Sequence, residues 1–423
     1  MDYFARPFTP NGSLLLPPSK SYSHRYLIGA FILNKPITIK NINWESEDVL
    51  FTYEALVKMG AVFQKDCNNN LNFIKRNDNY SNKIEINVGA SASTLRMLLP
   101  LCAYLFNETL IKGDVSLFKR PLAIYEEILA KQHITYIKTK DAINIKGKIK
   151  IEDFAFNGNI SSQFVTGILF LYAYAKSQNI ITLLGDIESL PYIDMTINVL
   201  QKIGYYFSFK DNKISLEKIE SCRLLYLGNE IDYSLLANFA ILASIKGSVK
   251  FKNYNKLSLQ PEVVLIDLLK QIGAQVENEN DILIIKSNKL NPFNIDISNA
   301  IDLGPILMAL ASFIKGESII TGYNRLKIKE SNRLEAMINE LKKADVNIKI
   351  SENKLIIKGK YNYKGNYTFD TYNDHRIAMA LTIFATLCKD PSTIIKAEVI
   401  NKSCKNFIKI LESLNNENSS RYL

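Results

Sequence analysis

The sequence predicts an α/β protein built from repeated units of about 70 residues. The first observation is a helix-like apolar pattern, usually ending in a small residue, that leads into a strand-like run and recurs along the chain. The second is that strand and helix patterns alternate within each unit, and the third is that several helical segments are apolar on nearly all sides. Units this long exceed the roughly 20 to 50 residues of solenoid repeats, so each is expected to be a small α/β subdomain. Equivalent positions in the six copies are Gly60, Gln132, Gly204, Gly273, Ala344 and Leu414.

The individual elements follow from these patterns in chain order. Short or alternating apolar runs predict strands over 37–40 and 83–88, and an amphipathic pattern predicts a helix over 48–59. We expect mixed sheets on the outside, buried helices on the inside, and the chemistry where two groups of units face each other. Buried helices are predicted over 93–104, 163–175, 235–244 and 306–313.

Length and composition narrow the class of protein. A chain of 423 residues predicts two to three domains, and 47% hydrophobic with 22% charged residues excludes disordered and collagen-like proteins. The longest apolar stretch, 95–106, is interrupted by Arg96 and Pro100 and is shorter than the ~20 residues of a membrane helix. The first residues contain no apolar segment typical of a signal peptide, so we expect a cytoplasmic protein.

Metal and disulfide chemistry are not predicted. The five cysteines lie far apart without a C-x-x-C pair, and there are only three histidines. Motifs for P-loop, dinucleotide, serine hydrolase and zinc protease sites are also missing from the sequence. We therefore expect reduced thiols and neither a metal nor a cofactor.

Several polar clusters at predicted element boundaries are candidates for chemistry. Hydroxyls and small residues at a helix start leave backbone N–H groups open to an anion, although a plain helix cap or a surface ion network explains each cluster alone. Pro121 is expected at the first position of a helix, and Ser331 and Glu335 are one residue too far apart for a capping box. The clusters are 19–25, 89–96, 119–121, 161–163, 327–333 and 372–376, with Asp302 as a single acid before an apolar helix.

The arginines indicate a shared role for these clusters. The net charge is +10, and only ten of the 52 basic residues are Arg. Scattered Lys is typical of a solvated surface, whereas Arg in so Lys-rich a chain suggests bidentate contacts with carboxylate or phosphate. Converging cations predict a pair of substrates bearing phosphates and carboxylates. Six of the ten fall in or beside the clusters, namely Arg25, Arg96, Arg120, Arg325, Arg333 and Arg376.

Taken together, these segments resemble the 5-enolpyruvylshikimate-3-phosphate synthase family of enolpyruvyl transferases, almost from end to end. The resemblance implies a two-domain inverse α/β barrel of six βαβαββ units, three per domain, with the active site in the interdomain cleft. One domain would comprise residues 17–228 and the other residues 1–16 with 229–423. The most specific matches are Ser19-Lys20-Ser21, Ser161-Ser162-Gln163, Pro191-Tyr192-Ile193-Asp194, Lys329-Glu330-Ser331 and Asp374-His375-Arg376.

The resemblance implies transfer of the 1-carboxyvinyl group of phosphoenolpyruvate to the 5-hydroxyl of 3-phosphoshikimate, with release of phosphate through a tetrahedral intermediate. Asp302 would accept the hydroxyl proton with Lys20 beside the same oxygen, and Glu330 would protonate the methylene carbon. The residues implied for 3-phosphoshikimate are Lys20, Ser21, Arg25, Ser161, Ser162, Gln163, Ser189, Tyr192, Asp302, Arg325 and Lys329. Those implied for phosphoenolpyruvate are Lys20, Ala92, Arg120, Gln163, Arg333, His375, Arg376 and Lys402.

Some positions depart from the family pattern. Asn332 stands where Asp is usual, Arg325 where some members have Asn, and Ser403 follows Lys402 where an aromatic residue is usual, so Lys402 is the weakest match. Ala92 stands where most members have a glycine that lines the phosphoenolpyruvate pocket. Glyphosate is thought to occupy that pocket in this family and is slightly longer than the substrate, so Ala92 implies reduced glyphosate sensitivity.

Three alternatives remain open from the sequence. A sister transferase acting on UDP-N-acetylglucosamine carries a cysteine near the equivalent of Arg120, where none of the five cysteines lies. A nucleic-acid protein related to RNA 3′-phosphate cyclase would suit the basic charge and 22 tyrosines, but no clustered basic stripe is visible. A degenerate, inactive transferase would suit the drift toward Lys, Asn and Ile. We expect a monomer with small-molecule substrates and no nucleic-acid or membrane partner.

Overall fold

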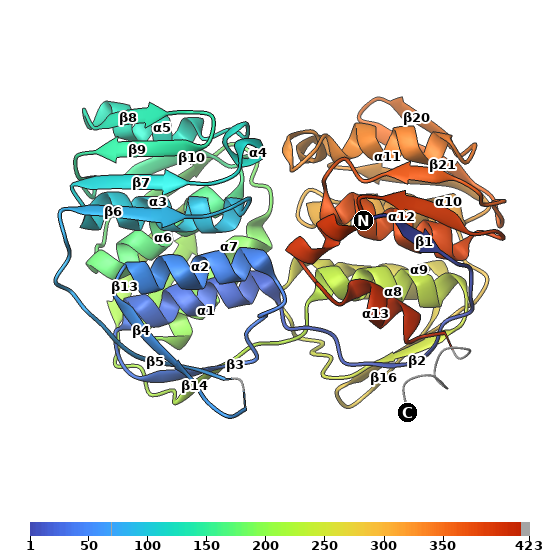
Figure 1. Cartoon of the computed structure of the whole chain (residues 1–423), viewed down its shortest axis with the longest axis horizontal. Coiled ribbons are helices and arrows are strands. Elements are labelled where there is room, and N and C mark those ends of the chain that lie inside the picture. Colours follow the sequence, from blue (N-terminus) through green and yellow to red (C-terminus); the bar gives the residue numbers. More distant parts are fainter. Residues whose placement is uncertain (69, 416–423) are drawn as a thin grey trace. The chain divides into compact units, whose positions relative to one another are not determined.

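The computed structural model describes residues 1–68 and 70–415, which fold into two compact units. The N-terminal unit comprises Pro18–Glu230, and the C-terminal unit comprises Met1–Pro17 and the chain from Ile231 onward (Figure 1). The sequence placed the two crossings between units near residues 16 and 229. Among the described residues, no helix combines the length and the apolar character that crossing a bilayer requires.

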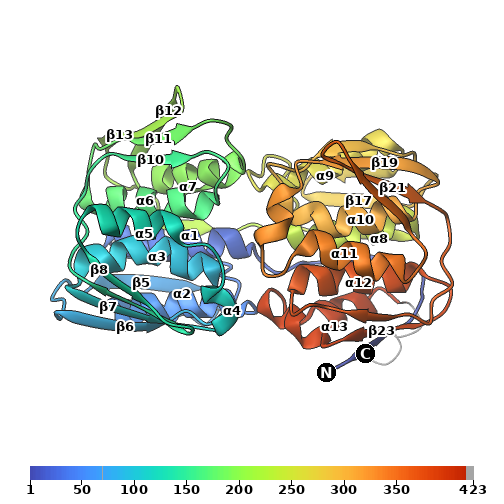
Figure 2. The same cartoon turned by 90° about the horizontal axis from the view of Figure 1, so that it is seen from above.

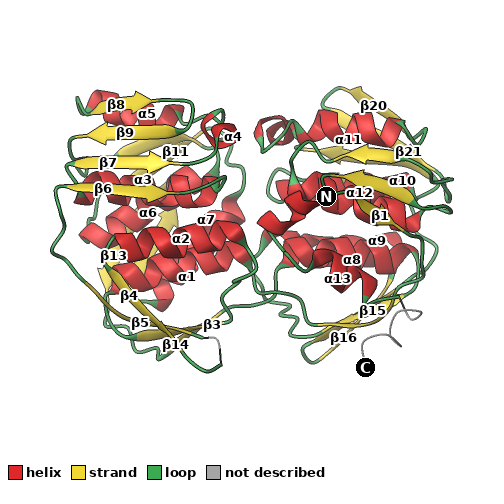
Figure 3. Cartoon of the chain, viewed as in Figure 1, coloured by secondary structure: helices red, strands yellow, loops and turns green. Residues whose placement is uncertain are grey.

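Three four-stranded sheets form the outside of the N-terminal unit, and each contains one parallel and two antiparallel pairings (Figure 3). The predicted strand Ile37–Lys40 is confirmed, and its alternating pattern turns Ile37 and Ile39 toward the core. In sheet order the strands are β14 (Tyr226–Gly228), β3 (Ile37–Lys40), β5 (Leu71–Arg76) and β4 (Ala61–Lys65); β6 (Lys83–Asn87), β7 (Glu108–Lys112), β9 (Ala142–Lys146) and β8 (Thr135–Lys138); and β10 (Phe154–Asn157), β11 (Ile181–Leu184), β13 (Lys213–Ile219) and β12 (Tyr205–Lys210).

Three almost wholly buried helices occupy the interior of this unit, where α3 and α1 both pack against α6. Their all-round apolar sequences suit such an interior, since every face of the helix is covered. The buried helices predicted over 93–104 and 163–175 are thereby confirmed. The inner helices are α1 (Lys20–Leu33), α3 (Ala92–Leu105) and α6 (Ser162–Ala175), and the others are α2 (Glu47–Lys58), α4 (Val115–Phe118), α5 (Ala123–Lys131) and α7 (Leu190–Lys202).

The C-terminal unit repeats this arrangement with strands from both ends of the chain. Two four-stranded sheets and one three-stranded sheet each contain one parallel pair. Strands β1 and β2 come from the first residues and pair with β23 and β15, so the start of the chain completes two of these sheets. In sheet order the strands are β16 (Gln275–Glu279), β17 (Ile282–Lys286), β15 (Ser248–Phe251) and β2 (Asn11–Leu14); β18 (Asn294–Asp296), β19 (Gly316–Thr321), β21 (Lys354–Gly359) and β20 (Asn347–Ser351); and β1 (Tyr3–Ala5), β23 (Ser392–Ile395) and β22 (Thr368–Asp370).

Three mutually packed helices fill the interior of the C-terminal unit, as Figure 2 shows from above. The helices predicted over 235–244 and 306–313 are confirmed as two of them. The inner helices are α8 (Tyr233–Ile245), α10 (Gly304–Ser312) and α12 (His375–Leu387), and the outer ones are α9 (Val264–Ile272), α11 (Arg333–Lys342) and α13 (Phe407–Glu412). Short 3-10 helices are η1 (Pro261–Val263), η2 (Ile301–Leu303), η3 (Asn324–Ile328) and η4 (Ala397–Lys402).

The expected helix start at Pro121 is wrong. Helix α5 begins at Ala123 with Leu122 as its N-cap, so Pro121 precedes the helix. Its carbonyl oxygen instead accepts a hydrogen bond from Arg96 Nη2 at 3.3 Å. This hydrogen bond to a residue distant in the sequence holds the chain in a bend before the helix. Local sequence patterns do not reveal such a contact.

Candidate active site

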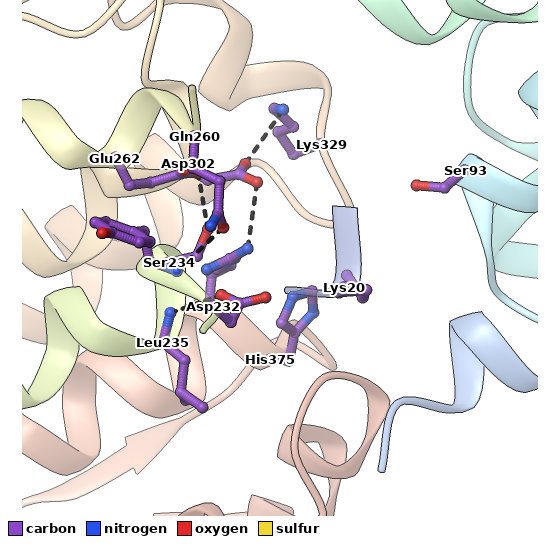
Figure 4. Close-up of polar contacts among 12 residues, drawn as sticks. Lys20, Ser93, Asp232, Ser234, Leu235, Gln260, Glu262, Asp302, Lys329 and His375 are labelled. Carbon is purple, nitrogen blue, oxygen red and sulfur yellow. Dashed lines mark hydrogen bonds and ion pairs between the residues drawn. The ribbon is translucent and has the colours of Figure 1, made fainter. Parts of the chain in front are cut away.

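Three cationic side chains converge on Asp302 in the C-terminal unit. Asp302 lies in η2, and its Oδ1 is 2.9 Å from Arg333 Nη1 and 3.3 Å from Lys329 Nζ. Its Oδ2 is 3.4 Å from Arg376 Nη2, so the carboxylate bridges three elements of the unit (Figure 4). A helix-cap role does not explain this acid, because the N-cap of η2 is Ala300. Asp302 is instead the counter-ion of an anion-binding cluster.

Asp374 holds the side chain of Arg333 and caps the helix that carries Arg376. The residue is fully buried, and its Oδ2 accepts hydrogen bonds from Arg333 Nε at 2.8 Å and Ser331 Oγ at 3.1 Å. Its Oδ1 accepts the backbone N–H of Arg376 at 2.9 Å and thereby caps α12. Burial raises the pKa of Asp374, but the Arg333 guanidinium outweighs this and holds that pKa below the usual range.

Glu330 lies between two further basic groups of the same unit. Its Oε2 is 2.9 Å from His375 Nδ1, and its Oε1 is 2.8 Å from Lys402 Nζ in η4. All three side chains are almost buried, which removes much of the solvent screening between them. The contact gives Lys402, the weakest match in the sequence, a definite place beside Glu330.

The cluster Glu330, Asp374 and His375 brings three ligand atoms within 4.8 Å of one another, as a bound metal ion requires. However, Arg333 and Lys402 already form ion pairs with the two carboxylates. A divalent cation would have to displace or repel these charges, so the donor set fits ion pairs better than a metal.

Lys329 and Arg325 complete the cluster in the C-terminal unit. Burial, together with the positive charges of Arg325 and Arg333, lowers the pKa of Lys329 to about 8, although Asp302 opposes the shift. Arg325 lies in η3 and is nearly buried. A cluster with more cations than acids around Asp302 attracts an anionic ligand.

The N-terminal unit carries a second set of predicted residues at the start of α1. Ser19 caps this helix by accepting the backbone N–H of Tyr22, whereas the sequence left Ser19 and Ser21 open as candidates for the cap. Lys20 Nζ lies 3.1 Å from Asp48 Oδ2, and both side chains are largely buried. Asp48 therefore fixes the position of the Lys20 ammonium.

Arg25 is a buried cation without a carboxylate partner among the described residues. Its Nε donates to Thr196 Oγ1 at 2.9 Å, Nη1 to the Ser21 carbonyl at 2.8 Å and Nη2 to the Tyr192 carbonyl at 2.9 Å. Burial lowers its pKa to about 10, so the guanidinium remains charged at neutral pH. An unneutralised buried charge favours an anionic ligand as its counter-ion.

Gln163, at the start of α6, is held from two sides. Its Nε2 donates to Ser93 Oγ at 2.8 Å, and its Oε1 accepts from Arg96 Nη1 at 3.0 Å. Arg96 also lies 3.5 Å from Ser161 Oγ and stacks 4.8 Å above the Phe164 ring. This network brings the hydroxyl of Ser161 and the amide of Gln163, both candidates from the sequence, close together.

Ala92 is the first residue of α3, and its loop is fixed by a buried chain of hydrogen bonds. Ser91 Oγ, Thr94 Oγ1, Thr52 Oγ1 and His24 Nδ1 follow one another at 2.8, 2.7 and 2.7 Å. Burial lowers the pKa of His24 to about 3, so the imidazole is neutral at physiological pH. The chain ties the Ala92 loop to α1 and α2.

The remaining predicted residues are placed as follows. Ser189 is the N-cap residue of α7, and Ser162 is the first residue of α6. Arg120 follows α4, directly before the Pro121 carbonyl that Arg96 binds. These positions put each residue at a helix start or a bend within the N-terminal unit.

Sequence reasoning missed three acids that shape these clusters. Asp48 looked like an ordinary acid in the first turn of a helix, and only the fold brings it to Lys20. Asp232 caps α8, and Glu262 accepts a hydrogen bond from Ser234 Oγ at 2.8 Å (Figure 4). Although burial lowers it, the pKa of Arg376 is raised overall by Asp302, Asp232 and Glu262. The spacing of these acids in the sequence gave no signal.

The described geometry suits proton transfer combined with the binding of anions. Asp302 is a carboxylate in contact with three cations, and Glu330 faces an imidazole and an ammonium. Arg25, Arg333 and Arg376 supply buried positive charge.

Comparison with known proteins adds an independent finding. Residues 8–411 match the family described as EPSP synthase (3-phosphoshikimate 1-carboxyvinyltransferase). The chain is 36% identical over 418 residues to the 3-phosphoshikimate 1-carboxyvinyltransferase of Clostridium kluyveri, covering 96% of this chain and 95% of that protein. It is 34% identical over 409 residues to the protein of the same name from Clostridium acetobutylicum, with 95% of both chains covered.

Solved structures show the same fold. The EPSP synthase of Acinetobacter baumannii superimposes with a TM-score of 0.80 at 24% identity over 98% of both chains. The enolpyruvyl transferase NikO of Streptomyces tendae superimposes with a TM-score of 0.72 at 13% identity, over 97% of this chain and 96% of that one. The mixed α/β fold predicted from the sequence is therefore confirmed.

Proposed function

Because the chain belongs to the EPSP synthase family and is a 3-phosphoshikimate 1-carboxyvinyltransferase of aromatic amino-acid biosynthesis, we propose that the two clusters described above are its substrate-binding and catalytic residues. The observation that carries this proposal is the C-terminal cluster, where Asp302 and Glu330 are each surrounded by basic groups. It combines two acids able to exchange protons with cations able to hold phosphate and carboxylate.

The N-terminal cluster supplies the proposed contacts for 3-phosphoshikimate. Arg25 is buried and has no carboxylate partner within residues 1–68 and 70–415, and Ser161 lies with Gln163 in the network of Arg96. Hydroxyl, amide and guanidinium donors together suit a sugar-like ring that bears a phosphate. The residues proposed for this substrate are Lys20, Ser21, Arg25, Ser161, Ser162, Gln163, Ser189, Tyr192, Asp302, Arg325 and Lys329.

Phosphoenolpyruvate is proposed to bind cations from both clusters. Arg333 and Arg376 provide bidentate donors for its carboxylate and phosphate, and Lys402 adds a point charge beside Glu330. The residues proposed for this substrate are Lys20, Ala92, Arg120, Gln163, Arg333, His375, Arg376 and Lys402.

The chemistry then proceeds in two balanced stages. Asp302 takes the proton of the 5-hydroxyl, whose oxygen bonds to C2 of phosphoenolpyruvate while Glu330 gives a proton to C3. In the elimination stage the ionised Glu330 takes a proton back from the methyl carbon, the double bond re-forms and the C2–O bond to phosphate breaks. The proton held by Asp302 passes to the released phosphate. Lys20, Arg333 and Arg376 stabilise the negative charge that develops on the departing phosphate.

The alternatives are not favoured by the comparisons. Both the matched family and the relatives carry the name 3-phosphoshikimate 1-carboxyvinyltransferase, rather than that of a UDP-N-acetylglucosamine transferase or an RNA cyclase. An inactive transferase is tested by a phosphate-release assay with both substrates. Phosphate release that requires both substrates supports the proposal, and its absence in the folded protein would contradict it.

We further propose that the protein acts in the cytoplasm as a monomer, whose two units correspond to the two domains of the family. The support is that one chain supplies every type of group that the reaction needs. Light scattering at the protein concentration of the activity assay tests the monomeric state.

Replacing Arg25 by Lys is expected to weaken 3-phosphoshikimate binding about tenfold while leaving the KM for phosphoenolpyruvate nearly unchanged. Lysine keeps the charge but loses the fork that contacts Thr196, Ser21 and Tyr192 together. Equilibrium binding of 3-phosphoshikimate and steady-state kinetics with both substrates measure the effect. Equal losses for both substrates would instead indicate a folding defect.

Replacing Ala92 by Gly is expected to increase sensitivity to glyphosate by roughly ten- to two-hundredfold. The side chain is 8% exposed, and the hydrogen-bond chain from Ser91 to His24 prevents the loop from moving aside. Overpacking by one methyl group costs about 1–3 kcal/mol, which corresponds to this factor. Inhibition constants against phosphoenolpyruvate measure the change, and agreement within about twofold would contradict the steric explanation.

A further inference from the structure

The two arginines of the C-terminal cluster already hold a carboxylate that belongs to the protein. Arg333 Nη1 and Arg376 Nη2 lie 2.9 and 3.4 Å from the two oxygens of Asp302. The arginine side chains are 4% and 10% exposed, whereas that of Asp302 is 22% exposed. The acid is therefore the solvent-facing member of the group, in the direction from which a dissolved anion arrives.

Arg333 has an anchor besides Asp302, whereas the Arg376 guanidinium is held by Asp302. Arg333 donates its Nε to the buried carboxylate of Asp374, which also caps the backbone at Arg376. The Nε of Arg376 is buried and has no hydrogen-bond partner among the described residues. The Arg333 guanidinium can thus release Asp302 and remain in place, and Arg376 has a donor to offer another anion.

We propose that Asp302 is an internal stand-in for the anionic group of phosphoenolpyruvate, which holds Arg333 and Arg376 in position and competes with the substrate for them. This inference rests on the proposed function and adds a second role to the acid. In the unliganded protein the carboxylate of Asp302 pairs with both buried guanidinium groups and adds to the charge that Asp374 already supplies to Arg333. Binding of the substrate exchanges one anion for another.

The exchange links substrate binding to the activity of the base. While Asp302 is paired with two guanidinium groups and an ammonium group, both of its oxygens are occupied. When the substrate draws the guanidinium groups to itself, these oxygens become available to accept the hydrogen bond of the 5-hydroxyl. The base is then available when phosphoenolpyruvate is bound and the 5-hydroxyl has an electrophile to attack.

The test is the affinity of the full-length protein for phosphoenolpyruvate alone, measured by calorimetry without 3-phosphoshikimate so that no turnover occurs. Removing the competing carboxylate with Asp302→Asn is expected to tighten binding about three- to tenfold. Asp302→Ser is a second neutral variant for the case that the amide disturbs η2, and thermal unfolding shows that each variant is folded. Inorganic phosphate as a probe should give the same order of affinities.

Two controls separate competition from a general change in charge. Asp302→Glu keeps the competing carboxylate, so it should not gain the tighter binding of the neutral variants. Glu317→Gln changes the net charge equally at an exposed position of β19 and should also leave affinity unchanged. Equal or weaker binding by both folded neutral variants would overturn the inference.

The proposed function and the inference fail in different measurements. A wild type that releases phosphate, together with neutral variants of unchanged affinity, would overturn only the inference. A folded wild type without turnover, together with neutral variants that bind more tightly, would overturn the function and leave the exchange of anions supported.

Discussion

Glu330→Gln is expected to lower kcat by about 100-fold or more, as the loss of a general acid does. Glutamine preserves the size of the side chain and one acceptor oxygen, but its amide is not a proton donor to carbon. The carboxyl group lies between His375 Nδ1 and Lys402 Nζ at 2.9 and 2.8 Å, so proton exchange has a defined path within the C-terminal cluster. Steady-state phosphate release with both substrates measures the effect.

The affinity for 3-phosphoshikimate should change little in this variant, since the proposed role of Glu330 concerns the other substrate. Glu335→Gln is a matched control, because the same chemical change is then made on an exposed residue of α11. It should retain kcat within about twofold. Near-normal turnover in Glu330→Gln would remove this residue from the mechanism.

Asp374→Ala is expected to lower the free energy of unfolding by about 3–5 kcal/mol, because it removes the fully buried one of the two carboxylates that pair with Arg333. The variant also loses the N-cap of α12, which typically contributes about 1 kcal/mol. Urea unfolding at pH 7 measures the difference. Asp374→Asn separates the two contributions, since the amide oxygen can still cap the helix but carries no charge.

The same pair predicts a dependence on pH. The pKa of Asp374 in the folded protein lies below the value of an unfolded aspartate, about 3.9. The stabilisation is therefore complete above that unfolded value and is lost as the pH falls through the folded value. The difference between wild type and Asp374→Ala should shrink in acid. A difference below about 1 kcal/mol at pH 7, or one that is constant down to acidic pH, would contradict this role.

The inner helices of both units could be predicted because an apolar sequence directly indicates a buried position. The segments that became α3 and α10 are apolar on nearly every side, and only a position inside a unit satisfies such a pattern. Strand Ile37–Lys40 followed from simple alternation of apolar and polar residues. These signals are local and need no knowledge of distant residues.

The partners within the clusters were not predictable in this way. The ion pairs of Asp302 with Arg333 and Arg376 join residues 31 and 74 positions apart, and only the packing of η2, α11 and α12 brings them together. The helix cap before α11 is instructive, since Asn332 supplies it by accepting the backbone N–H of Glu335. Ser331, whose spacing to Glu335 does not fit a capping box, instead donates a hydrogen bond to Asp374.

The first residues complete sheets of the C-terminal unit. The order of synthesis therefore affects when this unit can fold. Strand β1 is synthesised long before its partner β23, which begins only at Ser392. At about 5–20 residues per second the first strand waits roughly 20 to 75 seconds on the ribosome before it can pair. In that interval it is an unpaired edge, exposed to wrong partners. A shortened or obstructed N-terminus would therefore damage the unit that carries Asp302 and Glu330, hundreds of residues away in the sequence.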